Sequence, residues 1–296
     1  MRYHRRVPRV LIAGCGDVGT ALGLLLAADG HEVFGLRRSP GGLPEPIRPL
    51  AGDLTDVASL GAIPDGVDLV AYTAAADRFD DEAYRHAYVD GVANLLGALH
   101  ARRARPRRLL FTSSTAVYAQ TDGEWVDERS PAHPTSFSGQ RVLEGERLVL
   151  ASGVPAIVLR LAGIYGPGRT RVVDRVRSGA ATCPDGPPRW TNRIHRDDCA
   201  GAAHHLLTVE DADPFWLGVD HEPAEECAVL QWLAARLGVP PPRRVPREPG
   251  AAARRGSSMR CSNRKLLASG YAFRYPTFRD GYATLVDDDR PHRGEC

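Results

Sequence analysis

The chain contains almost no lysine, no closely paired cysteines and no long apolar run. Lys265 is the only lysine among 38 basic residues, and 36 acidic residues leave a net charge of +2. A charge this close to neutral gives no bulk electrostatic reason to expect nucleic acid or a membrane surface as a partner. No apolar run approaches the length of a membrane span. We therefore expect neither nucleic acid nor a membrane among the partners of this protein.

The six cysteines are scattered along the chain. None belongs to a C-x-x-C pair, and none has a histidine at the spacing of a metal site. The sequence therefore predicts no metal site and reduced thiols, as in a cytoplasmic protein. The basic N-terminus is followed by an apolar run of only Val10 to Ala13, which indicates a first strand and not a signal peptide.

The most informative segment is that short apolar run together with the glycines that follow it. Residues 9–19 read RVLIAGCGDVG, and residues 20–29 have a helical pattern. Gly14 allows the tight turn, Gly16 lets the backbone approach a pyrophosphate, and Gly19 lets the helix pack on the sheet. The N–H groups of a helix N-terminus bind phosphate. A dinucleotide is therefore predicted, with a ligand-free glycine turn as the alternative. The predicted contacts are Gly14, Cys15, Gly16, Asp17, Val18 and Gly19.

Strand-like and helical segments alternate through the first half of the chain, which predicts an α/β fold. We expect a Rossmann-type doubly wound parallel sheet with a smaller C-terminal substrate-binding portion. The NAD(P)-binding domain is placed at residues 1–165, with core elements extending to about residue 215. Residues 166–286 form the substrate-binding or lid portion, and residues 287–296 a disordered tail. We expect strands at residues 32–36, 67–74, 109–113 and 156–161. Helices are expected at residues 81–100, 137–151, 197–209 and 224–237. Loops are expected at residues 39–49, 183–193 and 240–256, of which the last two would be lids or connections.

Two arginines follow the second predicted strand. A carboxylate at this position would accept hydrogen bonds from the ribose of NAD, whereas Arg37 and Arg38 offer charge and donors to a 2′-phosphate. We therefore expect NADP in preference to NAD, with solvated loop arginines as the alternative. Asp53 follows the third predicted strand and is placed to meet the adenine, or else to cap a helix. The remaining predicted cofactor contacts are Leu54, Ala74 and Ala75.

Three further segments resemble the extended and atypical short-chain dehydrogenase/reductases, the group that includes nucleotide-sugar epimerases. They are TSSTAVY at residues 112–118, RLAGIYGPGR at 160–169 and IHRDD at 194–198, and the resemblance covers residues 9–286. It implies a Rossmann-type fold, a nicotinamide cofactor, a small metabolite as substrate and a homodimer formed through helices 81–100 and 137–151.

The resemblance also implies a catalytic set of Asn, Ser, Tyr and Lys, in which the Tyr and Lys lie in a Y-x-x-x-K helix. Ser114 matches the serine, but the helix reads F-S-G-Q-R from Phe137 to Arg141, and Tyr88 stands at the asparagine. Phe137 has no proton to give and is assigned to the substrate. Arg141 keeps a positive charge for the cofactor ribose, although its guanidinium is a poor copy of an ammonium group.

Three other residues are alternative proton sources. Tyr88, Tyr118 and His133 each carry a titratable group close to the altered motif, and packing or solvent exposure is the competing interpretation for each. Substrate contacts are expected from the second half of the chain, near a cleft. The predicted contacts there are Tyr165, Arg169, Asn192 and Arg193.

The sequence thus predicts an NAD(P)-binding enzyme similar to short-chain dehydrogenase/reductases. It would act on a small metabolite as an oxidoreductase or epimerase with a non-standard catalytic set, or without net redox chemistry. The loss of the Tyr and Lys favours an alternative from another class, a non-catalytic sensor or scaffold that binds the dinucleotide.

Overall fold

The computed structural model describes residues 7–210, 212–246 and 257–287. Its main element is a seven-stranded sheet with the strand order β12-β7-β5-β4-β1-β2-β3. The pairs β1–β2, β2–β3, β1–β4 and β4–β5 are parallel. The strand order therefore reverses between β1 and β4, where ligands bind in folds of this kind. The strands are β1 (Arg9–Ala13), β2 (Glu32–Arg37), β3 (Ile47–Ala51), β4 (Leu69–Tyr72), β5 (Arg108–Ser114), β7 (Ala156–Leu161) and β12 (Phe215–Gly218).

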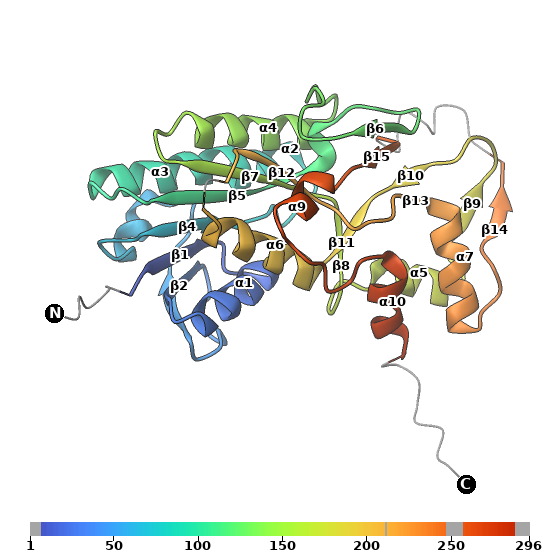
Figure 1. Cartoon of the computed structure of the whole chain (residues 1–296), viewed down its shortest axis with the longest axis horizontal. Helices are drawn as coiled ribbons and strands as arrows, with labels where there is room; N and C mark the ends of the chain where they lie inside the picture. Colours follow the sequence, from blue (N-terminus) through green and yellow to red (C-terminus); the bar gives the residue numbers. More distant parts are fainter. Residues whose placement is uncertain (1–6, 211, 247–256, 288–296) are drawn as a thin grey trace, which may run out of the picture. The chain divides into compact units, whose positions relative to one another are not determined.

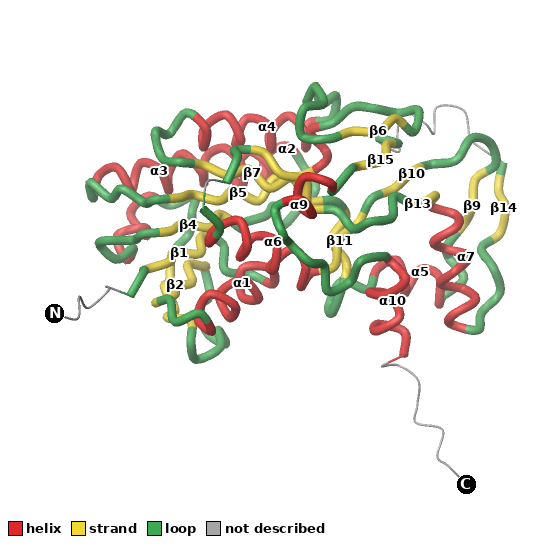
Figure 2. Tube along the Cα trace, viewed as in Figure 1, coloured by secondary structure: helices red, strands yellow, loops and turns green. Residues whose placement is uncertain are grey.

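Helices cover both faces of this sheet (Figures 1 and 2). Figure 1 shows α1 on one face and α3 with α4 on the other. The central strands are apolar along nearly their whole length because both of their faces are buried, and Leu11, Val70 and Phe111 lie in the core. The predicted doubly wound α/β fold is thereby confirmed. The helical elements are α1 (Asp17–Ala28), η1 (Val57–Ala62), α2 (Asp81–Arg85), η2 (His86–Asp90), α3 (Gly91–Ala101), η3 (Thr115–Val117), α4 (Phe137–Leu150) and α6 (Arg196–Thr208).

The chain divides into two compact units that alternate along the sequence. Unit 1 comprises the described residues up to Val117, together with Ala132–Arg160 and Cys199–Trp216. Unit 2 comprises Tyr118–Pro131, Leu161–Asp198 and the described residues from Leu217 onward.

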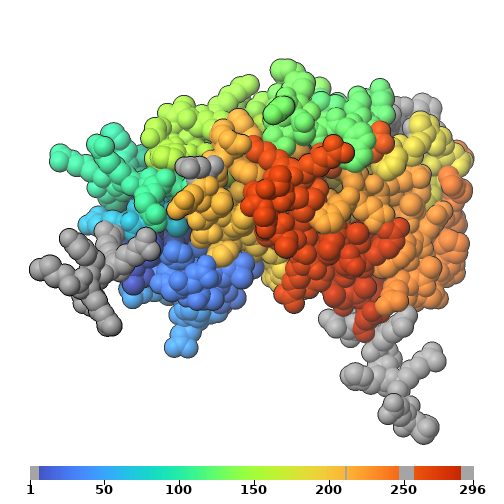
Figure 3. All heavy atoms as spheres, viewed as in Figure 1, coloured from blue at the N-terminus to red at the C-terminus, as the bar shows by residue number. Residues whose placement is uncertain are grey.

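Unit 2 is built from short strand pairs and helices. The pairs β6–β15, β8–β11 and β9–β14 are parallel, and β10–β13 is antiparallel. Figure 3 shows the atoms of α10 lying against those of α7, and Arg236 on α7 donates to Asp287 at the end of α10. The elements are β6 (Glu124–Val126), β8 (Gly163–Tyr165), α5 (Arg171–Arg177), β9 (Thr182–Pro184), β10 (Trp190–Thr191), β11 (Arg193–His195), β13 (Ala224–Glu225), α7 (Glu226–Leu237), β14 (Arg243–Val245), β15 (Met259–Cys261), α9 (Arg264–Ala268) and α10 (Phe278–Asp287).

Several predicted boundaries need correction. The helix expected at 81–100 contains the π-turn η2, in which the carbonyl oxygen of Ala87 accepts from the hydroxyl of Tyr72. Strand β3 begins inside the expected loop 39–49, and Pro49 is tolerated because β3 is an edge strand. The expected lid at 183–193 contains β10, and Arg243–Val245 forms β14. Residues 247–256 and 288–296, which include most of the predicted tail, lie outside the described residues.

Within the part of the chain that the structure describes, no helix is both long and apolar enough to cross a membrane. The same residues contain no group of three or more His, Cys, Asp or Glu side chains arranged to hold a metal ion.

Candidate cofactor and substrate site

The glycine turn after β1 has three glycines with different surroundings. Gly14 has a φ of +84°, and a Cβ there would lie 2.4 Å from backbone atoms of Ala74. A Cβ on Gly19 would lie 2.6 Å from the hydroxyl oxygen of Thr73, so α1 packs closely on the sheet. A Cβ on Gly16 would meet no heavy atom closer than 3.9 Å. The turn therefore needs Gly14 for its conformation and Gly19 for packing, whereas Gly16 leaves room for a ligand.

The start of α1 supplies donors at this turn. Gly16 is the N-cap residue and no side chain caps the helix, and a helix N-terminus of this kind is a favourable place for an anionic group. The N–H groups of Gly14 and Cys15 donate to the carbonyl oxygen of Leu36, which holds the turn against the end of β2. Cys15 and Val18 have buried side chains. An uncapped helix N-terminus beside an open glycine surface fits the phosphates of a dinucleotide.

The loop after β4 runs along the glycine turn. The Thr73 N–H donates to the carbonyl oxygen of Ala13 at 2.8 Å, and its hydroxyl donates to that of Gly14 at 2.9 Å. Ala74 is half-buried against Gly14, and Ala75 is exposed. The predicted contacts from this loop thus lie directly beside the predicted phosphate site.

Arg37 and Arg38 lie at the carboxyl end of β2. Arg37 donates to the carbonyl oxygen of Cys15 at 3.4 Å, which brings its guanidinium to the glycine turn. Both terminal nitrogens of Arg38 lie 3.4 Å from one carboxylate oxygen of Asp77 in the loop after β4. The two guanidinium groups therefore belong to the same strand-end region as the phosphate site.

Asp53 forms a local turn after β3. Its Oδ1 accepts from the N–H and the hydroxyl of Thr55, and this hydrogen bonding is the largest cause that lowers the pKa of Asp53. The N-cap of η1 is Asp56, not Asp53. Leu54 is held through its carbonyl oxygen, which accepts from the amide of Asn94.

Ser114 is the last residue of β5, and its hydroxyl oxygen accepts from the Ala116 N–H at 3.1 Å. The first turn of α4 packs on the residues that follow. A Cβ on Gly139 would lie 2.3 Å from the carbonyl oxygen of Ala116, so only glycine allows this approach. Phe137, at the start of α4, is therefore positioned close to the chain that leaves Ser114.

Tyr88 lies in the π-turn η2. Its phenol accepts a hydrogen bond from the backbone of Ala76, in the loop that passes the glycine turn, and burial raises the pKa of Tyr88 to about 12. Its ring centroid is 5.4 Å from that of Tyr84 and 6.4 Å from that of Phe111. A π-turn inside an α-helix often marks a functional position, and here it is the segment that carries Tyr88.

Arg141 has different partners from the expected ribose. Its Nε and Nη2 each donate to a carboxylate oxygen of Asp81 at 2.9 Å, and Nη1 donates to both oxygens of Glu144. These hydrogen bonds raise the pKa of Arg141. The guanidinium joins α4 to α2 in this structure, and its contact with the cofactor ribose stays a prediction.

Tyr118 and His133 lie in different surroundings. Tyr118 is in unit 2 with only 2% of its surface exposed, and its hydroxyl donates to the carbonyl oxygen of Asp127 at 2.8 Å. His133 is exposed in unit 1. This geometry favours packing for Tyr118 and solvation for His133, the competing interpretations of the sequence.

The predicted substrate residues of unit 2 are mostly turned inward. The amide of Asn192 donates to Met259 and accepts from Cys261, so it holds β15. Arg193 is buried with its guanidinium 5.5 Å from the ring centre of Phe278. Tyr165 is also buried, whereas Arg169 is exposed on a turn. Their contact with a substrate stays a prediction.

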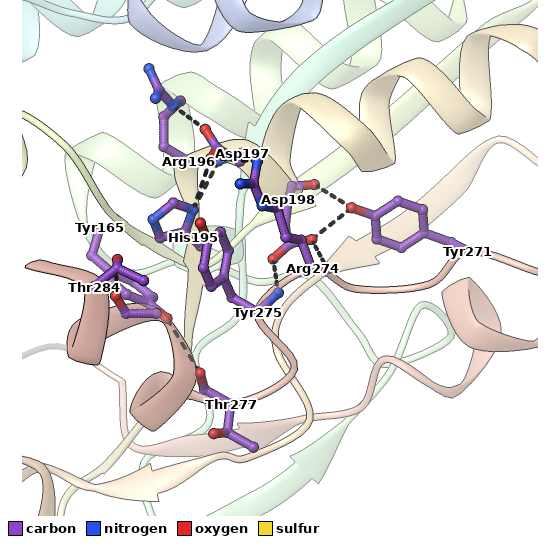
Figure 4. A network of polar contacts seen from close by, with 11 residues as sticks. Tyr165, His195, Arg196, Asp197, Asp198, Tyr271, Arg274, Tyr275, Thr277 and Thr284 are labelled. Atoms are coloured by element: carbon purple, nitrogen blue, oxygen red, sulfur yellow. Dashed lines mark hydrogen bonds and ion pairs between the residues drawn. The ribbon is translucent and has the colours of Figure 1, made fainter. Parts of the chain in front are cut away.

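Unit 2 also contains a buried polar network around the I-H-R-D-D segment (Figure 4). His195 lies between two rings, with its centroid 5.4 Å from Tyr165 and 3.9 Å from Tyr275. Its Nδ1 accepts from the Asp197 N–H, which places the ring proton on Nε2, and burial lowers its pKa. Nε2 has no hydrogen-bond partner among the described residues. His195 is therefore neutral and closes the strand-to-helix turn.

Asp198 fastens the segment before α10. Its two carboxylate oxygens accept from the Tyr271 hydroxyl and from the N–H groups of Arg274 and Tyr275, at 2.7 to 2.9 Å. Asp220 is another buried carboxyl group of unit 2, and burial raises its pKa to about 7. Asp220 Oδ2 is buried without a partner among the described residues. The sequence showed no signal for Asp220, whereas the D-D pair marked Asp198.

Sequence reasoning also missed a buried ion pair in unit 1. Arg160 on β7 donates from two nitrogens to the carboxylate of Glu146 on α4, at 2.8 and 2.9 Å, and Ser113 donates to the same carboxylate. Arg160 is the first residue of the RLAGIYGPGR segment that stood out in the sequence, whereas no sequence pattern marked Glu146 as its partner.

The fold and the site together define a class. A doubly wound parallel sheet with an open glycine turn at its switch point, an uncapped helix N-terminus and arginines at the end of β2 is a Rossmann-type NAD(P)-binding protein. Residues 10–214 match the model of the NAD-dependent epimerase/dehydratase family. The chain belongs to this family, which confirms the resemblance seen in the sequence, and it is an NAD(P)-binding enzyme similar to short-chain dehydrogenase/reductases.

Three known proteins illustrate the relationship. A 3-diazoavenalumate denitrifying reductase from a Streptomyces species is 34% identical over 260 residues, which cover 80% of this chain and 84% of the relative. Protein YeeZ of Escherichia coli K12 is 32% identical over 247 residues, covering 79% and 85%. The solved structure of human epimerase family protein SDR39U1 with NADPH has a TM-score of 0.77 at 20% identity, covers 95% of this chain and 99% of its own, and shows the likeness of fold.

Proposed function

We propose that the protein is an NADPH-dependent reductase of a small metabolite, with a catalytic set that lacks the Tyr–Lys pair. The observation that carries the proposal is the pair of arginines beside the uncapped glycine turn. A relative named as a reductase supports reduction, and structural neighbours solved with NADPH or with NAD support a nicotinamide dinucleotide as the cofactor.

The arginines favour a 2′-phosphate for electrostatic reasons. A guanidinium presents a planar set of donors that matches phosphate oxygens, and charge-assisted hydrogen bonds of this kind are the strong ones. Arg38 now faces Asp77 at 3.4 Å, and both side chains are more than half exposed. An exposed pair at this distance contributes little stability, so a phosphate can replace the carboxylate.

The chemistry follows from the ends of β4 and β5. When bound, the reduced nicotinamide supplies a hydride. The hydroxyl of Ser114 would donate a hydrogen bond to the substrate oxygen and orient it. Tyr88, whose phenol accepts a hydrogen bond from the backbone of Ala76 in the loop beside the glycine turn, is the proton donor that we favour. Phe137 closes the site without taking part in proton transfer.

Cofactor titration tests the proposal. NADPH and NADH are titrated by fluorescence against the wild type, Arg38→Ala and a control, Arg48→Ala, which removes an exposed arginine on β3. Loss of one charged hydrogen-bonding group predicts about a tenfold weaker NADPH affinity for Arg38→Ala and no change for NADH. The control should match the wild type. Failure of both dinucleotides to bind at millimolar concentration would refute the site itself.

The second candidate is a non-catalytic sensor. It is favoured because Arg141, the only charged residue of the F-S-G-Q-R segment, already forms an ion pair with Asp81. Carbonyl compounds are screened with NADPH, and turnover that Ser114→Ala abolishes would exclude the sensor. A protein that binds NADPH tightly and reduces none of the compounds supports it.

A further inference from the structure

Unit 1 carries a cluster of three aromatic rings, of which Phe79 is exposed and Tyr84 and Phe137 are half-buried. Phe79, in the loop between β4 and α2, has 75% of its surface exposed. Its ring centroid lies 5.1 Å from that of Phe137 and 5.6 Å from that of Tyr84, and the last two are 5.5 Å apart. Each ring therefore contacts the other two, at the separations that aromatic pairs prefer. A single exposed apolar residue is ordinary, but three rings in mutual contact form a defined surface.

Polar contacts hold this cluster in place. Phe137 and Arg141 are four residues apart on α4 and share one face of that helix. Arg141 binds both carboxylate oxygens of Asp81 in the first turn of α2, and Asp80 caps α2 by accepting from the Ala83 N–H at 2.8 Å. Phe137 and Arg141, which stand at the Tyr and Lys positions of Y-x-x-x-K, thus supply one ring of the cluster and one ion pair between α4 and α2. The rings are arranged before any ligand arrives.

The cluster adjoins the predicted reaction site through two loops. Phe79 follows the loop that lies against the glycine turn, and Ala76 in that loop hydrogen-bonds to Tyr88. The ring of Tyr88 is tilted against that of Tyr84 and lies edge-on to the buried ring of Phe111, so the contacts between rings continue inward. On the other side, the first turn of α4 packs on the residues after Ser114. The exposed side chain of Phe79, next to these loops, is placed to meet a flat apolar group.

We propose that Phe79, Tyr84 and Phe137 bind a planar aromatic group of the substrate. This inference rests on the proposed function, because it assigns the substrate class of the same site. Stacking of a planar group on a fixed ring costs little ordering of the protein, and each additional aromatic contact is favourable beyond the area that it buries.

The test uses trans-cinnamate as a planar aromatic probe and 3-cyclohexylpropanoate as its saturated counterpart, each titrated calorimetrically into the protein saturated with NADP. Cinnamate should bind about tenfold more tightly than the saturated acid, and Phe79→Ala should weaken cinnamate by about five- to tenfold. Phe79→Trp should restore its binding. Val57→Ala removes another exposed apolar side chain of unit 1, 60% exposed on η1, and should change nothing.

The outcomes separate the two proposals. Failure of the wild type to bind NADPH refutes the proposed function. Normal NADPH binding with equal affinity of cinnamate for the wild type and Phe79→Ala, or with no cinnamate binding, overturns the aromatic site alone. Sedimentation of the same variants adds a third outcome: conversion of a dimer to a monomer by Phe79→Ala, with cinnamate affinity unchanged, would show that the rings contact a second copy and would also overturn it.

Discussion

The buried ion pair between α4 and β7 makes a sharp prediction about stability. Only 1% of the Glu146 surface is exposed, and Arg160 is buried with it, 4.8 Å from the ring centre of Phe215. The carboxylate also accepts from Ser113 on β5. Glu146→Gln keeps the shape of the side chain and removes its charge, so the guanidinium of Arg160 stays buried without a counter-charge.

Removal of one partner of a buried pair costs about 3–5 kcal/mol of unfolding free energy. For a protein of this size we expect the melting temperature to fall by about 6–20 °C. Glu144→Gln is the matched control, because Glu144 lies two residues away on α4 and forms a surface pair with Arg141. Surface pairs contribute about 0–1 kcal/mol, so the control should melt within a few degrees of the wild type.

The assay is thermal unfolding followed by circular dichroism. The triple variant Ser113→Ala, Glu146→Leu and Arg160→Met replaces the whole polar group with apolar side chains, which is often neutral or stabilising. It should therefore melt well above Glu146→Gln. If Glu146→Gln lowers the melting temperature no more than Glu144→Gln, the reasoning that the buried charge must be paired is wrong.

Three further predictions concern the titration of one carboxyl group and the substitution of two glycines. Because burial raises the pKa of Asp220 to about 7, from 3.8 for an ordinary aspartate, the folded protein holds this proton more tightly than the unfolded chain. The unfolding free energy should therefore fall as pH rises from about 4 to about 7, relative to Asp220→Asn, and parallel urea-denaturation profiles would contradict this. Gly97→Ala on α3 meets open space and should stabilise by about 0.5–1 kcal/mol in the same assay. Gly14→Ala should lose NADPH binding, because its Cβ would meet the backbone of Ala74.

Local patterns in the sequence were sufficient for the frame of the fold. The apolar runs of β1, β5 and β7 and the glycines after β1 are encoded within a few neighbouring residues, so their structure could be predicted directly. The π-turn η2 could not, because it depends on Tyr72, which donates to Ala87 from a different element. For the same reason the sequence could not show which residue Arg141 binds, since its partner Asp81 lies 60 residues earlier.

The sequence by itself determined that this protein has a parallel α/β sheet with a glycine turn of the dinucleotide-binding type, and it predicts that Phe137 and Arg141 stand where the family has its Tyr and Lys. These features are matters of residue type and spacing along one segment. Only the tertiary structure decided that Phe137 joins Phe79 and Tyr84 in an aromatic cluster, that Arg141 joins two helices, and that Glu146 neutralises a buried arginine. Each of these depends on side chains brought together from distant parts of the chain. For Glu146 and Arg160 the low polarity of the interior also requires that the two charges be paired.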